Sequence, residues 1–282
     1  MSPLVAPTST LCRGRRPVVQ GSSEFEQLQI TIPTGDVAYI KAGHGEPVVY
    51  LHHSWGSPGA LPFHHNLIAT GFSTTIPDMP GWGGSTRPVW ARDVRDIAIL
   101  IGIAIDTLGL GPVTLIGAGF GGYVAAELAT MSPSRIARLV LMGAVGLYPD
   151  EGEILDQMML SHRQYIQESF RDRQTYVEHF GEEPDAQIRT LWDLSREMTA
   201  RVSWKPYMHN RRLQHLLPNV TCPSLIVYGE KDKVAPRSLA QQFEKILPNA
   251  KLELVPNAGH LVEFEEPKVV ADLVCEHMRR CS

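Results

Sequence analysis

The sequence predicts an α/β fold, in which a mostly parallel sheet is flanked by helices. Short, wholly apolar runs, as expected of strands buried on both faces, alternate with segments that are apolar at helical spacing. One such run, residues 113–116, passes through a glycine-rich turn into a helix, and turns of this kind hold their apex residue above the end of a sheet. A polar and charged stretch with a helical pattern, residues 148–218, interrupts the alternation, so we also expect a helical insertion.

The composition is that of an ordinary globular protein. The chain has 282 residues, of which 43% are hydrophobic and 20% charged, which suits one α/β domain with an insertion. A formal net charge of -4 without a large basic block disfavours nucleic-acid binding, and the longest apolar stretch, residues 97–105, is too short to cross a membrane. Four cysteines without metal-type spacing favour a reducing compartment, so we expect a cytoplasmic protein without nucleic-acid or membrane partners.

The first half of the chain supplies a hairpin and the first parallel strands. Residues 28–32 and 37–40 alternate apolar and polar side chains around a Thr34-Gly35-Asp36 turn, which predicts a β-hairpin. Helices are expected at residues 94–108 and 123–131. The expected strands are residues 47–51, 72–76, 113–116 and 136–142.

The second half begins with the helical insertion and then resumes the alternation. Gly181-Glu182-Glu183-Pro184-Asp185 divides the insertion into at least two helical parts. Strands follow at 223–228 and 252–255, and helices at 238–247 and 267–278, the last with proline in its first turn. We therefore divide the chain into three parts. Residues 1–23, rich in Pro, Ser, Thr and Arg, form a flexible tail. Residues 24–147 together with 219–282 form the core domain, and residues 148–218 form a helical cap.

Five segments, taken in order along the chain, resemble the loops of the α/β-hydrolase-fold superfamily in its cap-containing branch. They are the loop after the third strand, an Asp-x-Pro-Gly-x-Gly-x-Ser loop, the glycine elbow, and the loops that carry the family's catalytic acid and histidine: Leu51–Gly56, Asp78–Ser85, Gly117–Gly122, Tyr228–Asp232 and Asn257–His260. Each segment alone is weakly specific. Their order and spacing together predict an α/β-hydrolase fold from about residue 24 onward.

The resemblance implies a set of catalytic groups. In this family a serine attacks a carbonyl, a histidine takes its proton, and a carboxylate orients the histidine. The matching loops assign the histidine to His260 and the carboxylate to Asp232, and they predict a hydrogen bond between the two. They also predict an oxyanion hole made by the backbone N–H groups of Phe120 and Ser54.

Two residues depart from the family's pattern. Gly119 stands at the apex of the elbow, where the nucleophile belongs, so the triad is degenerate. The apex must adopt a positive φ, which costs a non-glycine residue on the order of 1–3 kcal/mol and which glycine adopts freely. The backbone donors of an oxyanion hole survive such a change. His53 replaces the family's usual glycine and adds a titratable group that we expect at the mouth of the pocket.

The same turn also fits the dinucleotide-binding fingerprint, as Gly117-x-Gly119-x-x-Gly122 between a strand and a helix. That fingerprint expects an acidic residue at the end of the next strand, about 20 residues further on, and Leu141-Met142-Gly143-Ala144 has none. The other four family-like segments would also remain unexplained. We therefore favour the hydrolase-type elbow.

A glycine apex leaves three functional hypotheses. The first is an enzyme in which His260 acts directly on water or on a substrate proton, which gives hydrolysis or the proton-abstraction chemistry of the family's lyases and cofactor-free oxygenases. The second is a non-catalytic protein that encloses a small ligand, since a shaped pocket needs no nucleophile. The third is a serine hydrolase whose nucleophile has been replaced by Gly119. We favour the first, because His260 and Asp232 are retained.

The expected substrate is a small, largely apolar carbonyl compound, cleaved at an ester-like or C–C bond. Candidates for contact with it are His53, Trp55, Trp204 and Tyr207, although packing of the cap onto the core explains the two cap residues equally well. The motifs call for no metal and no organic cofactor. A small-molecule substrate or ligand is the expected partner, and a homodimer is left open.

Overall fold

The structure is a computed structural model that describes residues 25–280, so the predicted tail, residues 1–23, lies outside the described part. Eight strands form a single sheet in the order β1-β2-β4-β3-β5-β6-β7-β8. The strands are β1 Glu26–Ile32, β2 Gly35–Ala42, β3 Glu46–Leu51, β4 Phe72–Pro77, β5 Val113–Ala118, β6 Ile136–Met142, β7 Ser224–Gly229 and β8 Ala250–Val255. The predicted α/β fold is confirmed.

The direction of the strands brings the predicted functional loops together. β1 and β2 form an antiparallel hairpin that pairs with β4, whereas every neighbouring pair from β4 to β8 is parallel. Ligands of open parallel sheets bind at the carboxyl ends of the strands. The loops that follow β3, β5, β7 and β8 lie at this edge, and they contain the residues to which the sequence assigns chemistry.

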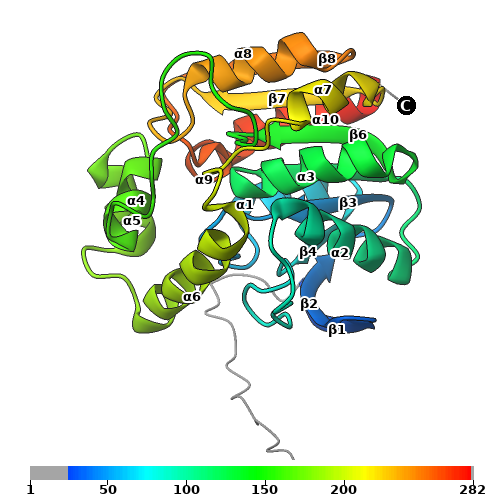
Figure 1. Cartoon of the computed structure of the whole chain (residues 1–282), viewed down its shortest axis with the longest axis horizontal. Helices are drawn as coiled ribbons and strands as arrows, with labels where there is room; N and C mark the ends of the chain where they lie inside the picture. Colours follow the sequence, from blue (N-terminus) through cyan, green and yellow to red (C-terminus); the bar gives the residue numbers. More distant parts are fainter. Residues whose placement is uncertain (1–24, 281–282) are drawn as a thin grey trace, which may run out of the picture.

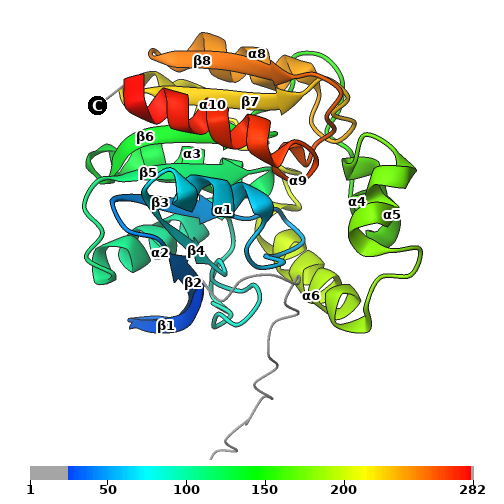
Figure 2. The same ribbon diagram turned by 180° about the vertical axis from the view of Figure 1, so that it is seen from behind.

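Helices cover both faces of the sheet, and each face has its own apolar core. Figure 1 shows α2 Val94–Thr107, α3 Phe120–Met131 and α8 Arg237–Ile246 in front of the sheet. Figure 2 shows α1 Pro62–Ala69 and α10 Pro267–Arg280 on the opposite face. Along β6 the side chains alternate between the two cores, with Leu139 and Leu141 in the first and Val140 and Met142 in the second, as the two-residue period of a strand requires.

The segment between β6 and β7 is helical. It contains α4 His162–Ser169, α5 Arg173–Phe180, α6 Ala186–Ser203 and the short α7 Leu213–Leu216. In both ribbon views α4 to α6 stand beyond one end of the sheet, on the side of the functional loops. The buried Leu213 of α7 instead belongs to the core of α3. The boundaries of the predicted cap, residues 148 and 218, stay a prediction.

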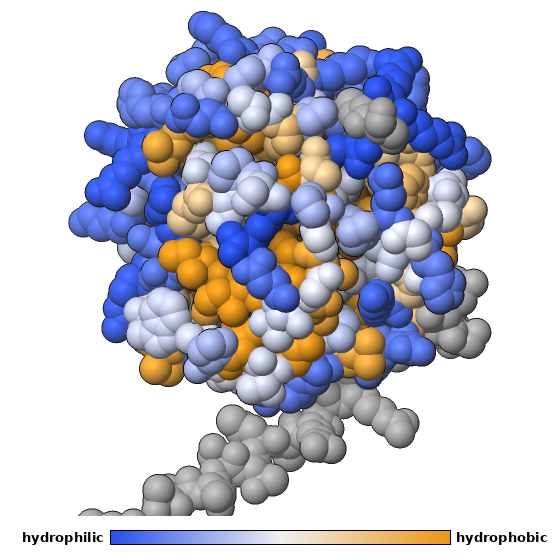
Figure 3. Space-filling view, turned by 90° about the vertical axis from the view of Figure 1, so that its right-hand side faces the viewer, coloured by the Kyte–Doolittle hydropathy of each residue, from blue (hydrophilic) through white to orange (hydrophobic). Residues whose placement is uncertain are grey.

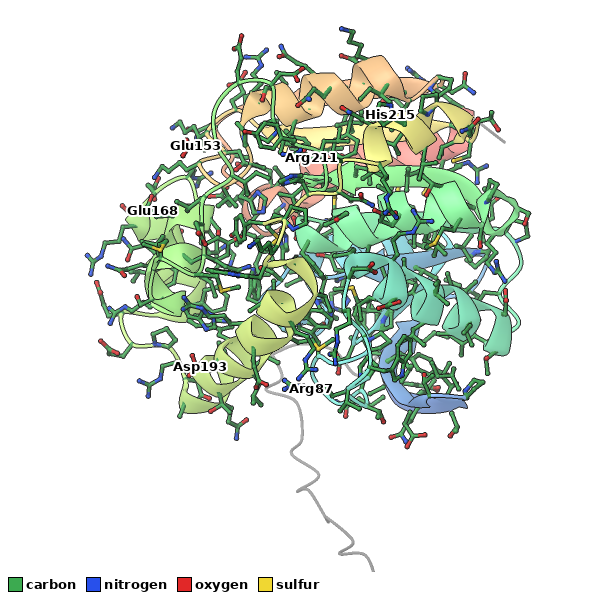
Figure 4. The ribbon with its side chains drawn as sticks, viewed as in Figure 1. Arg87, Glu153, Glu168, Asp193, Arg211 and His215 are labelled. Atoms are coloured by element: carbon green, nitrogen blue, oxygen red, sulfur yellow. The ribbon has the colours of Figure 1, made fainter. Side chains whose placement is uncertain are left out.

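Charged side chains connect these helices to the core at the surface. Arg87, which lies beneath α6 in Figure 4, contacts Glu197 of α6 at 2.6 Å. Glu168, at the outer side of α4, contacts Lys233 from the loop after β7 at 3.4 Å. Exposed ion pairs of this kind are worth about 1 kcal/mol or less. Buried contacts therefore determine where the cap helices sit.

No helix in residues 25–280 combines the length and the apolar character needed to cross a membrane. Figure 3 shows the face turned away from α4 to α6, where apolar residues gather in the lower half among polar ones.

Candidate active site

The elbow between β5 and α3 has the backbone that the sequence predicts. Gly119 has a φ of 53° and a ψ of -114°, so the expected positive φ is confirmed. Its N–H donates to the carbonyl of Met142 at 2.8 Å, which ties the turn to the neighbouring strand β6. Two residues on, a Cβ on Gly121 would lie 2.2 Å from the carbonyl oxygen of Leu51, so only glycine allows α3 to start this close to β3.

His260 and Asp232 meet at the same edge of the sheet. His260 Nδ1 lies 2.9 Å from Asp232 Oδ2, and both side chains are 3% exposed. The other carboxylate oxygen of Asp232 accepts the N–H groups of Val234 and Ala235, each at 2.8 Å. One carboxylate oxygen of Asp232 therefore stabilises the local turn, while the other is hydrogen-bonded to His260. Because a carboxylate accepts, Nδ1 of His260 carries the hydrogen and Nε2 keeps a lone pair.

The lone pair of His260 faces the elbow. Nε2 lies 3.0 Å from the point at which a Cβ on Gly119 would stand. In a serine enzyme of this fold, the Cβ of the nucleophilic serine stands at that point. His260 Nε2 thus faces the elbow, and Gly119 supplies no side-chain atom there.

His53 does not lie at the mouth of a pocket, contrary to the expectation from the sequence. Its side chain is 3% exposed, and its Nδ1 would be 2.4 Å from a Cβ on Gly119. The ring stacks on Trp55, with centroids 5.8 Å apart and an interplanar angle of 10°, and it meets the ring of His260 edge-on at 5.2 Å. The imidazole therefore stands too close for a side chain at position 119.

A buried carboxylate holds His53 in place. Glu263, in the short helix α9 Val262–Glu265, accepts from His53 Nε2 at 2.8 Å and from the Tyr50 hydroxyl at 2.9 Å. The side chain of Glu263 is fully buried. Neither Glu263 nor Tyr50 was predicted as a site residue from the sequence. A carboxylate three residues after His260, within the apolar run Leu261–Phe264, was the available signal, because a buried charge needs a partner.

The charges of this second pair follow from burial. Burial lowers the pKa of His53, while the nearby Glu263 carboxylate and its hydrogen bond act in the opposite direction. Burial by itself raises the pKa of Glu263, but the attraction of His53 and the hydrogen bonds that the carboxylate accepts bring that pKa below its usual value. We take a neutral His53 beside an ionised Glu263, because full burial penalises a charged imidazole most and the carboxylate keeps two donors.

The backbone amides of Ser54 and Phe120, which the sequence assigns to an oxyanion hole, have no hydrogen-bond acceptor among the described residues. The carbonyl of His53 accepts the N–H of Gly56 at 3.1 Å and faces Nδ1 of His52 at 2.7 Å. Since the two polar groups of a trans peptide point in opposite directions, the N–H of Ser54 points away from His52. Neither this amide nor that of Phe120 donates a hydrogen bond within residues 25–280. The Phe120 amide also lies at the start of α3, where the helix dipole favours negative charge.

The model of the alpha/beta hydrolase family matches residues 42–273. The chain belongs to this family. A 2-hydroxy-6-oxononadienedioate/2-hydroxy-6-oxononatrienedioate hydrolase of Burkholderia vietnamiensis is 28% identical over 268 residues, which cover 86% of this chain and 91% of that protein. The serine hydrolase BPHL of Homo sapiens is 29% identical over 255 residues, which cover 86% of this chain and 83% of that protein.

Solved structures show the same fold. The meta-cleavage product hydrolase CumD from Pseudomonas fluorescens superposes with a TM-score of 0.74 at 22% identity, covering 90% of this chain and 98% of that one. A putative lipase from Acinetobacter baumannii gives a TM-score of 0.74 at 17% identity and covers 92% of each chain. At these identities the likeness concerns the fold alone.

Residues between β6 and β7 of this α/β hydrolase reach the loop that contains Ser54. The Ser54 hydroxyl donates to Oε1 of the buried Gln157 at 3.2 Å. The backbone N–H of Gln157 in turn donates to the Tyr207 hydroxyl at 2.8 Å, and that hydroxyl donates to the carbonyl of Leu155 at 2.9 Å. Tyr207, a candidate for substrate contact, thus supports the segment that contacts Ser54. Gln157 was not predicted, because a glutamine in a polar stretch carries no signal of burial.

The other two aromatic candidates differ in their surroundings. Trp55 is 2% exposed and packs on the Phe180 and Phe264 rings at 6.2 and 5.6 Å, and its contact with a substrate stays a prediction. Trp204, after the end of α6, is 51% exposed and contributes to the surface of the cap. Within residues 25–280 no group of three or more His, Cys, Asp or Glu side chains is arranged to hold a metal ion.

Proposed function

We propose that this α/β hydrolase cleaves a small, largely apolar carbonyl compound, at an ester-like or C–C bond, by adding water to the carbonyl without a covalent serine intermediate. His260 is the general base, Asp232 orients it, and the amides of Phe120 and Ser54 bind the oxyanion. The observation that carries the proposal is the position of His260 Nε2, 3.0 Å from where a side chain of Gly119 would begin. A base in that position can take a proton from a nucleophile that is not part of the chain, which here is water.

The packing around Gly119 supports a site without serine. A Cβ at this position would approach His53 Nδ1 to 2.4 Å, closer than real Cβ contacts come. Glu263 holds His53 through Nε2, so the ring cannot move aside without breaking a buried hydrogen bond. The large residue at position 53 and the small one at position 119 therefore fit each other, which argues against a serine simply lost from an otherwise standard site.

The relatives support the bond type. Six of the matching curated proteins, with 26–28% identity, are named 2-hydroxy-6-oxononadienedioate/2-hydroxy-6-oxononatrienedioate hydrolases. Cleavage of such a compound by water needs a base, an oxyanion hole and a route for one proton to the leaving carbon. His260 and the two amides supply these groups, so a ketone with a conjugated leaving group is the first substrate class to test.

The test compares turnover in variants of the base. We expect His260→Gln to lower kcat/KM by about 10²- to 10⁴-fold, as is usual for the loss of a general base, and Asp232→Asn to lower it at least tenfold. The substrates are a 2-hydroxy-6-oxo-dienoate, followed by its absorbance, and 4-nitrophenyl butyrate. His215→Gln, which changes an exposed histidine of α7, is the matched control and should keep full activity (Figure 4).

Two further measurements separate the alternatives. Direct addition of water predicts that mass spectrometry finds no acyl-enzyme during turnover and that a fluorophosphonate leaves the protein unlabelled. A covalent adduct on the chain contradicts the proposed mechanism. Tight binding of the dienoate without any product, in the wild type as well as in His260→Gln, contradicts catalysis and indicates a ligand-binding protein.

A further inference from the structure

The site contains two histidine–carboxylate pairs that face each other. One pair is His260 with Asp232, joined by 2.9 Å, and the other is His53 with Glu263, joined by 2.8 Å. All four side chains are at most 3% exposed. The family's mechanism uses the first pair only, and the second pair has no role in the function proposed above.

The carboxylates determine which ring nitrogens carry hydrogen. Glu263 accepts from Nε2 of His53, so in the neutral ring Nδ1 keeps its lone pair. Asp232 accepts from Nδ1 of His260, so Nε2 keeps its lone pair. These two bare nitrogens lie 2.4 and 3.0 Å from one and the same point, the Cβ position of Gly119.

Two converging lone pairs need a donor between them. No hydrogen bond joins His53 to His260 among the described residues, although their rings are 5.2 Å apart. A molecule with two O–H hydrogens satisfies both nitrogens at once. Water is such a molecule, and it is also the nucleophile that the proposed hydrolysis requires.

We propose that His53 is a second catalytic base, which grips the attacking water together with His260 and takes its second proton. The inference rests on the proposed hydrolysis and assigns a role to the residue that fills the nucleophile's place. His260 Nε2 accepts one hydrogen of the water and His53 Nδ1 the other. The oxygen is thereby held above Gly119, beside the amides of Phe120 and Ser54.

Each proton of the attacking water has its own acceptor in this geometry. The water oxygen bonds to the carbonyl carbon, one of its protons moves to His260 Nε2, and the C=O π pair moves onto the oxygen held by the amides. On collapse that pair re-forms C=O, the bond to the leaving group breaks, and the leaving atom takes the proton from His260. The hydroxyl proton of the acid product passes to His53 Nδ1, and His53 later releases it to solvent.

Glu263 gives this second base its strength. A carboxylate behind an imidazole stabilises the charged ring, as Asp232 does for His260. Tyr50 donates to the same carboxylate and keeps it oriented. The other ionisable groups that act on His53 are His260, which disfavours its charged form, and Asp232, which favours it.

The decisive variant is His53→Gln. The glutamine amide can reach the position of Nε2 and keep a donor for Glu263, but it offers no basic nitrogen toward Gly119. We expect kcat to fall about 10- to 100-fold with KM within about threefold, and the acid limb of the pH–kcat profile to change from two coupled ionisations to one. His64→Asn, which removes another fully buried histidine, is the control and should keep the wild-type kcat and pH profile.

A measurement without turnover tests the same inference. In protein labelled with ¹⁵N-histidine, NMR at neutral pH should show hydrogen on Nε2 of His53 and on Nδ1 of His260. Hydrogen on Nδ1 of His53 would overturn the proposal, and so would an unchanged kcat and pH profile in His53→Gln. If His53→Gln does not fold, Glu263→Gln replaces it and should also lower kcat, because His53 loses the charge that supports it.

Failure of the two proposals can be told apart. An active enzyme in which His260→Gln is inactive and His53→Gln is fully active refutes the second base and leaves the proposed function intact. A protein without hydrolytic activity refutes the proposed function, and the tautomer of His53 then decides whether the two-nitrogen acceptor site exists.

Discussion

The exchange between positions 53 and 119 defines the site at the scale of single residues. His53 places a ring nitrogen 2.4 Å from where a side chain of Gly119 would begin, so the family's usual serine does not fit at position 119 while His53 is present. The sequence reveals that both residues depart from the family's pattern, but the two departures lie in separate loops and nothing in the sequence connects them. Only the geometry shows that the ring of His53 leaves no room for a side chain at position 119.

This exchange predicts that Gly119→Ser is destabilising and unreactive. The serine would add backbone strain at a φ of 53° and a clash with His53, together on the order of 3 kcal/mol. Urea unfolding measures this loss. Gly109→Ser is the control, since Gly109 has a φ of 63° and open space around its Cβ position, and it should lose only about 1 kcal/mol.

The compensating change should rescue the serine. In His53→Gly/Gly119→Ser the clash is removed, and Glu263→Leu can be added to remove the carboxylate that would lose its partner. We expect this variant to be labelled by a fluorophosphonate, which reports an activated serine beside His260. A single Gly119→Ser protein that is as stable as the wild type and reacts with the probe would show that His53 does not block this position.

At the scale of elements, the sequence predicts the strands and most core helices because their patterns are local. The strand at 136–142 agrees to the residue, and the helix at 94–108 ends one residue early, at Thr107. The helix after the elbow begins at Phe120 rather than at residue 123, because its first turn contains Gly121 and Gly122, which have low helix propensity. The short helices α1 and α9 were not predicted, and α9 carries Glu263.

The loop that contains Ser54 is hydrogen-bonded to helix α6. The carbonyl of Ser54 accepts the Trp82 indole N–H at 3.0 Å and the Thr199 hydroxyl of α6 at 2.9 Å. Thr199 also bonds back to Ser195 within its own helix at 2.9 Å. The cap therefore holds the backbone that is proposed to bind the oxyanion, which the sequence could not show because no motif links residues 54 and 199.

We predict that Thr199→Val lowers kcat/KM about fivefold, which corresponds to the loss of one hydrogen bond of about 1 kcal/mol. Thr190→Val is the matched control on the same helix, because Thr190 is exposed and makes only the bond back to Ala186 at 2.9 Å. Rates on the dienoate and thermal unfolding are measured for both. Equal losses of activity in the two variants would show that the contact with Ser54 does not matter for catalysis.

At the scale of the whole molecule, loops from four strands converge on one edge of the sheet, and the order of motifs along the chain was enough to predict that convergence. The pairing of His260 with Asp232 was predictable for the same reason, because each lies in a loop with its own signature. The pairing of His53 with Glu263 was not, since these residues are 210 positions apart and neither belongs to a motif that names the other.

Buried neutral histidines should also set the pH dependence of folding. Burial lowers the pKa of His64 to about 3, while the unfolded value is about 6.5. Its Nδ1 accepts the N–H of Leu61 at 2.9 Å at the start of α1, and protonation would remove this acceptor. Between these pKa values the unfolded chain binds more protons than the folded one, so the free energy of unfolding falls as the pH falls from about 6.5 toward about 3.

We therefore predict that the wild type loses on the order of a few kcal/mol of stability from pH 7.5 to pH 4, and that His64→Asn loses less over the same range. The asparagine oxygen can still accept from Leu61, but it does not titrate, so the variant is less stable than the wild type at pH 7.5 and the difference narrows toward pH 4. Urea unfolding at several pH values measures both curves. His215→Gln, an exposed histidine, should keep the wild-type slope, and equal slopes for His64→Asn and wild type would refute the assignment to His64.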